Sequence, residues 1–519
     1  MGSKPNFMQL LLLCLPVAAV IGLFVPGYSL LFFWAVTAEI AACGLDFFSW
    51  LRSSRRKKQK SSALNKKEFT WEEVSEHNSA DSAWVSVHGL VYDITNFVQS
   101  HPGGKEFILL AAGRDATDAF ESYHPFTDKP KRVLAKYEIG KLVTFEHPSF
   151  LPDSGFYQEC RDAVRSYFER TGKDHKAPFA GLWRMSFIYM AGMAAYTISY
   201  VMGHSMPMVV RLAGAIVLGI AQGLPLTHWM HDASHGSIGH TEWWWWTCGR
   251  LSLDWISGSS MVAWRNQHVI GHHIYTNVLG SDPDLPVSLE GDPRRLVPAQ
   301  VWKALYKLQH LYLPPLYGVL SLKSRIQDVL EVFGKHWNGP IRVNPISMQD
   351  VLRQFGSKTF WLFYRLAVPY FVLNVPLLAL IPLFIVTEFT TGYWLAFNFQ
   401  VSHISQDVDY FVKKSADGKA HVIDEEWAKL QVKTSVDYSH GSVWNTFFSG
   451  ALNYQTVHHL FPSVSQYHYP DIAPIILDIC KKHSIKYNCL PTFSSAFKAH
   501  IDHLYDMGVQ GKAVPLKLE

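Results

Sequence analysis

Histidines in three short clusters are the residues of this chain whose type and spacing best suit chemistry. The clusters hold His231 and His235, then His268, His272 and His273, then His458 and His459 after Gln455. Residues three to five apart share one face of a helix. If these helices converge, they offer about eight neutral nitrogen ligands, which are too many for one tetrahedral zinc and suit a pair of iron atoms.

Another histidine pair precedes these clusters. His101 opens a His-Pro-Gly-Gly sequence, and His124 follows it further along the chain. By itself, the motif is also explained by a turn before a helix, with two incidental surface histidines. The second histidine and the runs at 91–97 and 113–117 favour a binding site at this pair over two incidental surface histidines.

The composition of the elements that must position these histidines indicates a membrane protein. Of 519 residues, 48% are hydrophobic and 17% are charged, and the charged fraction is below the globular norm of about 25%. A net charge of +4 is too small to argue for nucleic acid. Six scattered cysteines without a CxxC pair indicate a reduced compartment and no thiolate metal site.

Residues 1–60 are predicted to form a membrane anchor or hairpin with a basic flank. The stretch 7–50 is apolar, is divided at Pro26 and Gly27, and is followed by a run of Arg and Lys between 52 and 60. Such a basic run normally stays cytoplasmic. A cleaved signal peptide is the alternative, because the first apolar stretch resembles the hydrophobic region of one.

The rest of the chain divides into three predicted parts: a small soluble domain at 66–142, a charged connector at 143–182 and a membrane domain at 183–519. Spanning helices are expected at about 183–203 and 208–227, with two more within 361–402. The four consecutive tryptophans Trp243 to Trp246 are expected to anchor an interfacial or re-entrant segment. If the chain crosses the membrane an even number of times between successive histidine clusters, all three clusters lie on the same membrane face. That face is also the one that carries the basic run at 52–60.

The predicted fold class is therefore mainly α. It combines a polytopic helical membrane core, a cytosolic histidine-rich cap and a small α+β domain.

The small domain at 66–142 resembles cytochrome b5. The resemblance is carried by residues 91–97, 101–104, 113–117 and 120–125. In this family two histidines bind the iron of haem b from opposite sides. The resemblance implies that His101 and His124 are the haem ligands.

The three clusters resemble the histidine boxes of front-end membrane fatty-acid desaturases, which carry a fused cytochrome b5 domain. The boxes are HxxxH, HxxxHH and QxxHH, and the glutamine of the third is the front-end hallmark. The resemblance implies two non-haem iron ions, O2 as co-substrate, and Gln455 among the catalytic residues. The implied iron ligands are His231, His235, His268, His272, His273, His403, His458 and His459.

Groups that support the iron ligands are also candidates. Asp232, Asp282 and Asp284 could partner the outer nitrogens of the imidazoles, although capping or loop roles fit them equally well. His228 is placed inside its helix as a supporting group and is excluded from the ligands.

The resemblance implies an enzyme that inserts a cis double bond into a polyunsaturated fatty acyl chain from the membrane. Electrons would come from an NADH-dependent cytochrome b5 reductase, at the cytosolic face of the endoplasmic reticulum. Residues 275–277, 282–284, 312–314, 341–345 and 468–471 most resemble the delta-5 subgroup, which acts on C20 chains.

Several alternatives stay open. They are a delta-4, delta-6 or delta-8 desaturase, including the sphingoid-base class, a hydroxylase, and a b5 electron carrier without catalysis. Two features depart from the family: Val457 replaces a common glutamate before the paired histidines, and the apolar block at 7–50 is additional.

Overall fold

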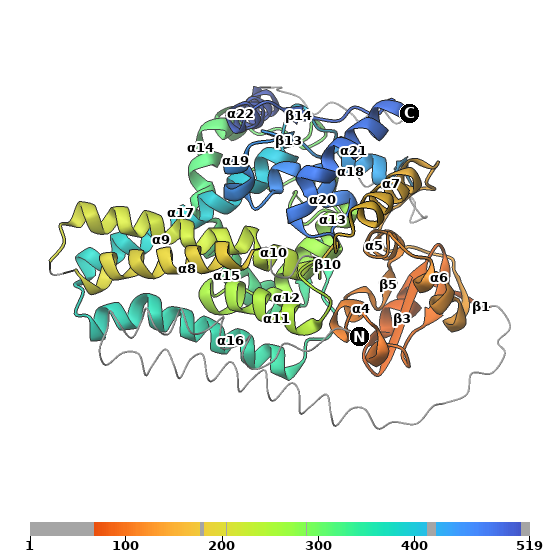
Figure 1. Cartoon of the computed structure of the whole chain (residues 1–519), viewed down its shortest axis with the longest axis horizontal. Coiled ribbons are helices and arrows are strands. Elements are labelled where there is room, and N and C mark those ends of the chain that lie inside the picture. Colours follow the sequence, from red (N-terminus) through yellow and green to blue (C-terminus); the bar gives the residue numbers. More distant parts are fainter. Residues whose placement is uncertain (1–66, 177–180, 204, 287, 413–421, 510–519) are drawn as a thin grey trace.

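The computed structural model describes residues 67–176, 181–203, 205–286, 288–412 and 422–509. The predicted anchor and basic flank at 1–60 lie outside the described residues. Within them, a bundle of long helices protrudes to one side, and a helical cap and a small mixed domain lie together at its other end (Figure 1). This arrangement confirms the predicted fold class.

The small domain is a sheet flanked by short helices. Its strands run in the order β1-β6-β4-β3-β2, with β5 beside β3. They are β1 (Lys67–Phe69), β2 (Asn78–Ser79), β3 (Ser82–Val87), β4 (Leu90–Asp93), β5 (Arg114–Asp115) and β6 (Glu138–Leu142). Its helices are α3 (Trp71–Glu76), α4 (Lys105–Ala111), α5 (Thr117–Tyr123) and α6 (Lys129–Leu134). Alternate residues Ala83, Val85 and Val87 of β3 face the core, as the period of a strand requires.

The protruding bundle contains α8 (Leu182–Tyr196), α9 (Met208–Thr227), α16 (Met348–Leu362) and α17 (Leu377–His403). Helix α8 continues as η3 (Thr197–Val201) and α16 as η9 (Phe363–Val372). Helix α9 packs along both α8 and α17. Among the residues that the structure describes, two helices are long and apolar enough to cross a membrane: Met208–Ser234, which joins α9 to α10 (Trp229–Ser234), and Leu377–His403.

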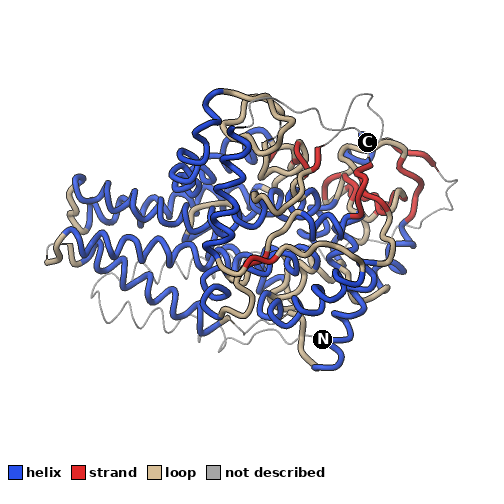
Figure 2. Tube along the Cα trace, turned by 90° about the horizontal axis from the view of Figure 1, so that it is seen from above, coloured by secondary structure: helices blue, strands red, loops and turns tan. Residues whose placement is uncertain are grey.

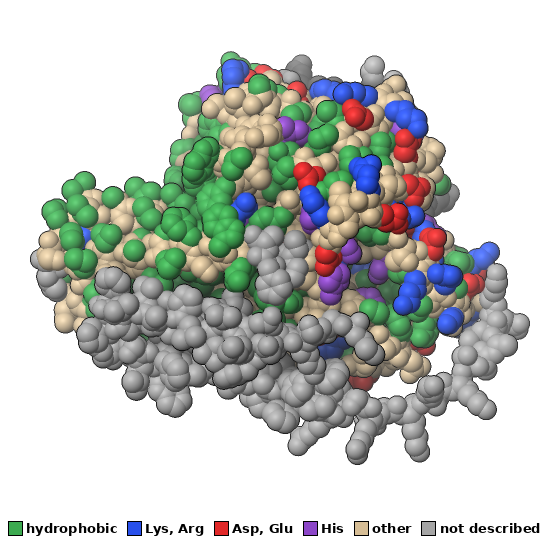
Figure 3. Space-filling model, in the orientation of Figure 1, with side chains coloured by type: hydrophobic (Ala, Val, Ile, Leu, Met, Phe, Trp, Pro, Cys, Tyr) green, Lys and Arg blue, Asp and Glu red, His purple; other side chains and the backbone are tan. Residues whose placement is uncertain are grey.

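The outer surface of the bundle is apolar. Hydrophobic side chains cover its visible face, whereas charged side chains gather on the cap and the small domain (Figure 3). Leu378 is 92% exposed and Phe371 75% exposed. Large apolar side chains left uncovered in this way suit contact with lipid.

One acidic residue lies inside this bundle. Glu388 interrupts the apolar sequence of α17 and is fully buried. Arg325, on α15 (Leu320–Gln327), lies 2.6 Å from its carboxylate, and Arg365 lies 3.4 Å away. The two guanidinium groups supply the partner charge that a buried carboxylate requires.

The cap is built from helices that precede, separate and follow the long ones along the chain. Seen from above, strands lie in the cap and the small domain rather than along the protruding helices (Figure 2). The cap helices that matter for the site are α7 (Phe156–Thr171), α10 (Trp229–Ser234), α11 (Glu242–Arg250), α12 (Met261–Trp264), η5 (Arg265–His272), α13 (His273–Tyr275), α18 (Trp427–Lys433), α20 (Gln455–Leu460) and α21 (Tyr469–Lys482). Val457 is buried in the apolar core between α7, α18, α20 and α21, so this side chain supports the cap.

The tryptophan run occupies a different environment from the predicted one. Trp244 and Trp245 of α11 are buried, and Trp245 meets Phe107 of α4 edge-on at 5.3 Å. The prediction of an interfacial anchor is therefore wrong for these two residues. Both pack in a buried cluster with residues of α8, α9 and α10 instead of facing lipid, and Trp245 also reaches the small domain through Phe107.

Candidate metal centres

Eight buried histidines converge where the bundle meets the cap. They come from α10 and its end, from η5 and α13, from the end of α17, and from α20. The eight are His231, His235, His268, His272, His273, His403, His458 and His459. Segments far apart in the sequence thus meet at one place, as the sequence analysis predicted for the clusters.

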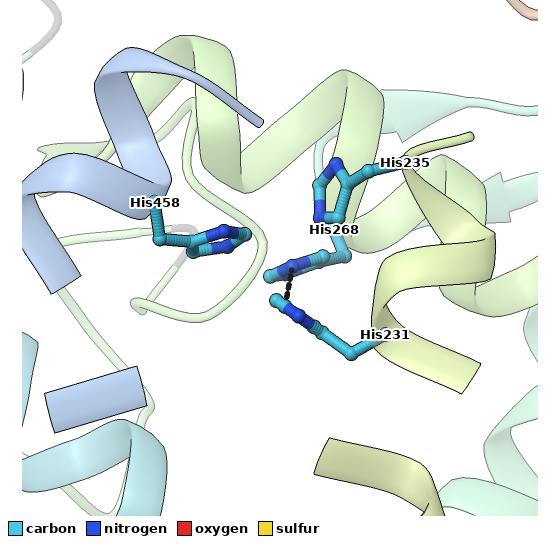
Figure 4. Close-up of side chains that lie close together, drawn as sticks. All are labelled: His231, His235, His268 and His458. Atoms are coloured by element: carbon cyan, nitrogen blue, oxygen red, sulfur yellow. Dashed lines mark hydrogen bonds between the residues drawn. The ribbon is translucent and has the colours of Figure 1, made fainter. Parts of the chain in front are cut away.

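The first group contains His231, His235, His268 and His458, whose ligand atoms lie within 4.8 Å of one another. Their imidazoles point toward one another from three different segments (Figure 4). The Nε2 atoms of His231 and His268 are 3.0 Å apart. Two neighbouring ligands on one metal ion, with bonds of about 2.1 Å at right angles, lie about 3.0 Å apart. The spacing therefore fits a shared metal ion.

The second group contains His272, His403 and His459, also within 4.8 Å. The Nε2 atoms of His272 and His403 are 3.3 Å apart. The side-chain amide nitrogen of Gln455 lies 2.8 Å from Nε2 of His403 and 3.0 Å from Nε2 of His459. His273 adjoins both groups, since its ligand atom clusters with those of His458 and His459 and its Nε2 lies 3.2 Å from that of His268.

The imidazole rings of His101 and His124, the other predicted pair, face each other within the small domain. Their ring centroids are 6.3 Å apart and the rings are inclined by 79°. In each, Nδ1 donates a hydrogen bond of 2.9 Å to a backbone carbonyl, of Gly104 or of Phe120. Each Nε2 is left for a metal, and a six-coordinate iron between two such imidazoles fits this spacing.

Comparison with known proteins identifies both parts. A family model described as fatty acid desaturase matches residues 207–491, and one described as cytochrome b5-like haem/steroid binding domain matches 70–143. The chain belongs to the fatty acid desaturase family. It is a front-end desaturase with a fused cytochrome b5 domain, and hence an oxidoreductase.

This desaturase aligns with similar proteins over most of its own length and most of theirs. The Delta(5) fatty acid desaturase A of Dictyostelium discoideum is 42% identical over 86% of this chain and 95% of its own. The acyl-lipid (8-3)-desaturase of Mortierella alpina is 38% identical over 86% of this chain and 98% of its own. The acyl-lipid (8-3)-desaturase of Physcomitrium patens is 34% identical, covering 85% and 92%.

Outer partners orient five of the eight imidazoles of the desaturase. In these five, Nδ1 faces a polar group and leaves Nε2 toward the group of histidines. The pairs are His272 with Asp282 at 3.2 Å, His403 with the Thr434 carbonyl at 3.0 Å, His459 with Gln431 at 2.8 Å, His458 with Tyr469 at 3.1 Å, and His235 with Tyr123 at 2.6 Å. The inward Nε2 atoms of His235 and His458 are buried and have no hydrogen-bond partner within the described chain. Such orphaned atoms fit metal ligands.

Two expected supporting residues act elsewhere. Asp232 accepts hydrogen bonds from Ser465 and Gln466, so it takes the structural role that the sequence left open. His228 donates from Nε2 to the Phe447 carbonyl and lies in neither histidine group.

Sequence reasoning missed Gln431, Thr434, Tyr123 and Tyr469 as supporting residues. Gln431 and Thr434 carry no pattern, because they are isolated polar residues on a short buried helix and at its end. Tyr469 lies within 468–471, a segment that resembles the delta-5 subgroup, but that resemblance assigns no role to the tyrosine.

Electrostatics favours the ligating form of most imidazoles. Burial, with neighbouring imidazoles adding to it, lowers the pKa of His458 and His459 well below the ordinary value. Burial also lowers the pKa of His124 to about 4. These rings are therefore neutral at pH 7. His272 differs, because the charge and hydrogen bond of Asp282 outweigh burial and raise its pKa.

The carboxylate of Asp282 gives a first prediction. If the second histidine group holds a metal ion, we expect Asp282→Asn to weaken its retention by about 10- to 100-fold, the usual loss when an outer partner of a ligand is removed. The measurement is the iron that remains after dialysis against graded chelator. Asp174→Asn is the matched control, because Asp174 pairs with the exposed His240 outside both groups. Equal retention in Asp282→Asn and wild type would contradict this role.

Proposed function

We propose that this desaturase introduces a cis double bond at the delta-5 position of C20 polyunsaturated fatty acyl chains. The observation that carries the desaturation is the convergence of eight buried imidazoles into two adjoining groups. The delta-5 position is supported by similarity to the Delta(5) fatty acid desaturase A of Dictyostelium discoideum, at 42% identity, and to the relative from the same organism named Probable Delta(5) fatty acid desaturase C, at 40%.

We assign one iron to each group. His231, His235, His268 and His458 would hold the first ion, and His272, His403 and His459 the second, with His273 available between them. When bound, the iron pair would supply the oxidising power that removes hydrogen from two adjacent methylenes, with O2 as the oxidant.

Gln455 has a distinct role in this proposal. Its amide lies between His403 and His459, and its Oε1 is buried without a hydrogen-bond partner in the described chain. A glutamine amide can present either its oxygen or its nitrogen by rotation of the last torsion. We propose that Gln455 presents its oxygen to the second site, directly or through a water.

The surrounding chain excludes bulk water. His458, His459 and Gln455 are all 1% exposed or less, and their helix packs on the apolar core of the cap. Beside His272 and His403, a cavity of about 10 Å³ is also lined by Phe399 and Leu285. This is about the space of one water molecule. A buried centre from which bulk water is excluded protects a strongly oxidising reaction from side reactions.

The electron supply is proposed in the same way. His101 and His124 would hold haem b, and a cytochrome b5 reductase using NADH would reduce it. We place the enzyme in the endoplasmic reticulum membrane, with the small domain and the cap in the cytosol. The basic run between 52 and 60 supports this orientation.

The domain limits also remain proposals. We assign an anchor and basic flank to 1–60, the b5 domain to 66–142, a connector to 143–182 and the desaturase domain to 183–519. The spans are proposed at 183–203, 208–227 and, as two helices, within 361–402.

The direct test is expression in yeast fed separately with C18, C20 and C22 polyunsaturated acids. We expect a new C20 product, and mass spectrometry of derivatised methyl esters should locate its added bond at delta-5. A bond at delta-4, delta-6 or delta-8, or in a sphingoid base, would replace the proposed position. No new product with any acid, from protein that carries haem and iron, would contradict desaturation and favour an electron carrier.

A further inference from the structure

The small domain docks onto the first histidine group through the helices that flank its haem ligands. Tyr123, the last residue of α5, directly precedes His124 in the chain. Its hydroxyl lies 2.6 Å from Nδ1 of His235, and the two rings are nearly parallel, at 24°. A residue bonded covalently to one candidate haem ligand thus contacts a candidate iron ligand.

Other contacts hold this interface together. The backbone nitrogen of Lys105 donates to Glu242 at 2.9 Å, next to the Gly104 turn. Gly104 has a φ of +86°, and any side chain there would collide with the carboxylate of Glu242. The small domain therefore approaches the cap closely on the side of His101 as well.

Two further contacts anchor the same surface. The guanidinium of Arg265 lies 4.2 Å from the ring of Phe107 and 4.0 Å from that of Trp246. Asn344 donates from its amide to the carbonyls of Leu109 and Ala112, both at 2.8 Å. These contacts end on backbone atoms or aromatic rings, so docking does not depend on the Tyr123 hydroxyl.

We infer that Tyr123 is a positioning residue that electronically couples the haem ligand His124 to the iron ligand His235. The connection is short: the chain joins His124 to Tyr123, and one hydrogen bond joins Tyr123 to His235. The opposite nitrogen of His235 is buried without a partner in the described chain and belongs to the first group. The inference rests on the proposed function, since it assumes both haem and iron.

The electron balance of the step is simple. One electron leaves the ferrous haem, which becomes ferric, and reduces one ferric non-haem ion to ferrous. Tyr123 starts and ends as a neutral phenol. Nδ1–H of His235 donates to its hydroxyl oxygen when Nε2 binds the metal.

Tyr123→Phe tests the coupling, because it removes the hydroxyl and keeps the ring. The full-length enzyme is reduced anaerobically with NADH and a catalytic amount of reductase, then mixed with O2 and a C20 trienoyl substrate while haem absorbance is followed. We expect substrate-dependent haem oxidation to slow by about tenfold or more, the lower end of the loss for an outer partner of a metal ligand. Tyr137→Phe is the matched control, because its ring packs on Phe97 within the same domain.

A second measurement separates coupling from mere support of the iron site. A viologen mediator reduces the non-haem irons directly, and product per enzyme is counted after O2 is admitted. We expect Tyr123→Phe to keep the wild-type haem spectrum and, per non-haem iron bound, to lose less product with the mediator than it loses in rate of haem oxidation, because weaker support of His235 would lower both alike. A wild-type rate of haem oxidation in the variant would overturn the coupling, and so would a proportional loss of product with the mediator. Wild-type enzyme that makes no product in either measurement would instead overturn the proposed function.

Discussion

Replacing His272 by alanine should abolish double-bond formation while the haem spectrum stays intact. His272 is buried, its Nε2 faces His403 at 3.3 Å, and its Nδ1 faces Asp282. Alanine would remove one of three imidazoles from the second group and leave Asp282 buried without that partner. We expect product to fall by more than about 100-fold, beyond the usual loss for an outer partner.

The measurement is product formation in yeast together with the haem spectrum of the purified protein. His240→Ala is the control, because His240 is exposed and pairs with Asp174 outside the metal groups. Continued desaturation in the His272 variant would remove this histidine from the centre. Loss of product together with the haem spectrum would indicate a general folding defect and would not support the assignment.

His124→Ala should remove the spectrum of a haem with two axial imidazoles and stop turnover driven by NADH. The ring of His124 faces that of His101, and burial keeps it neutral, which is the form that binds iron. Alanine would leave one axial position without a protein ligand. Non-haem iron should remain, because His124 belongs to neither metal group.

Absorbance of oxidised and reduced protein tests this expectation, with non-haem iron measured separately. His88→Ala is the matched control within the same domain, because His88 is exposed and pairs with Glu121. An unchanged spectrum in both His124→Ala and His101→Ala would refute the haem site. Together with His272→Ala, this variant separates delivery of electrons from their use.

The distribution of neighbouring histidines depends on the fold. His458 faces the first group and His459 the second, although they are adjacent in sequence. Successive residues on a helix point about 100° apart, so a helix wedged between two sites supplies both of them. The spacing within each cluster predicts shared helix faces, but it cannot assign a histidine to one of two sites.

The supporting residues depend on the fold even more strongly. Thr434 and Gln431 meet His403 and His459 because α18 packs beside α20 and the end of α17. Trp245 and Tyr123 became informative only when the small domain was placed against the cap.

The sequence alone determined the kinds of chemistry and the fold class of this protein. Periodic histidines and long apolar stretches are local patterns, and local backbone geometry relates them directly to helix faces and spans. Only the tertiary structure decided which imidazoles share a site, which groups orient them, and how the haem domain meets them. Those features arise from packing between segments hundreds of residues apart, and the spacing along one segment carries no information about its neighbour.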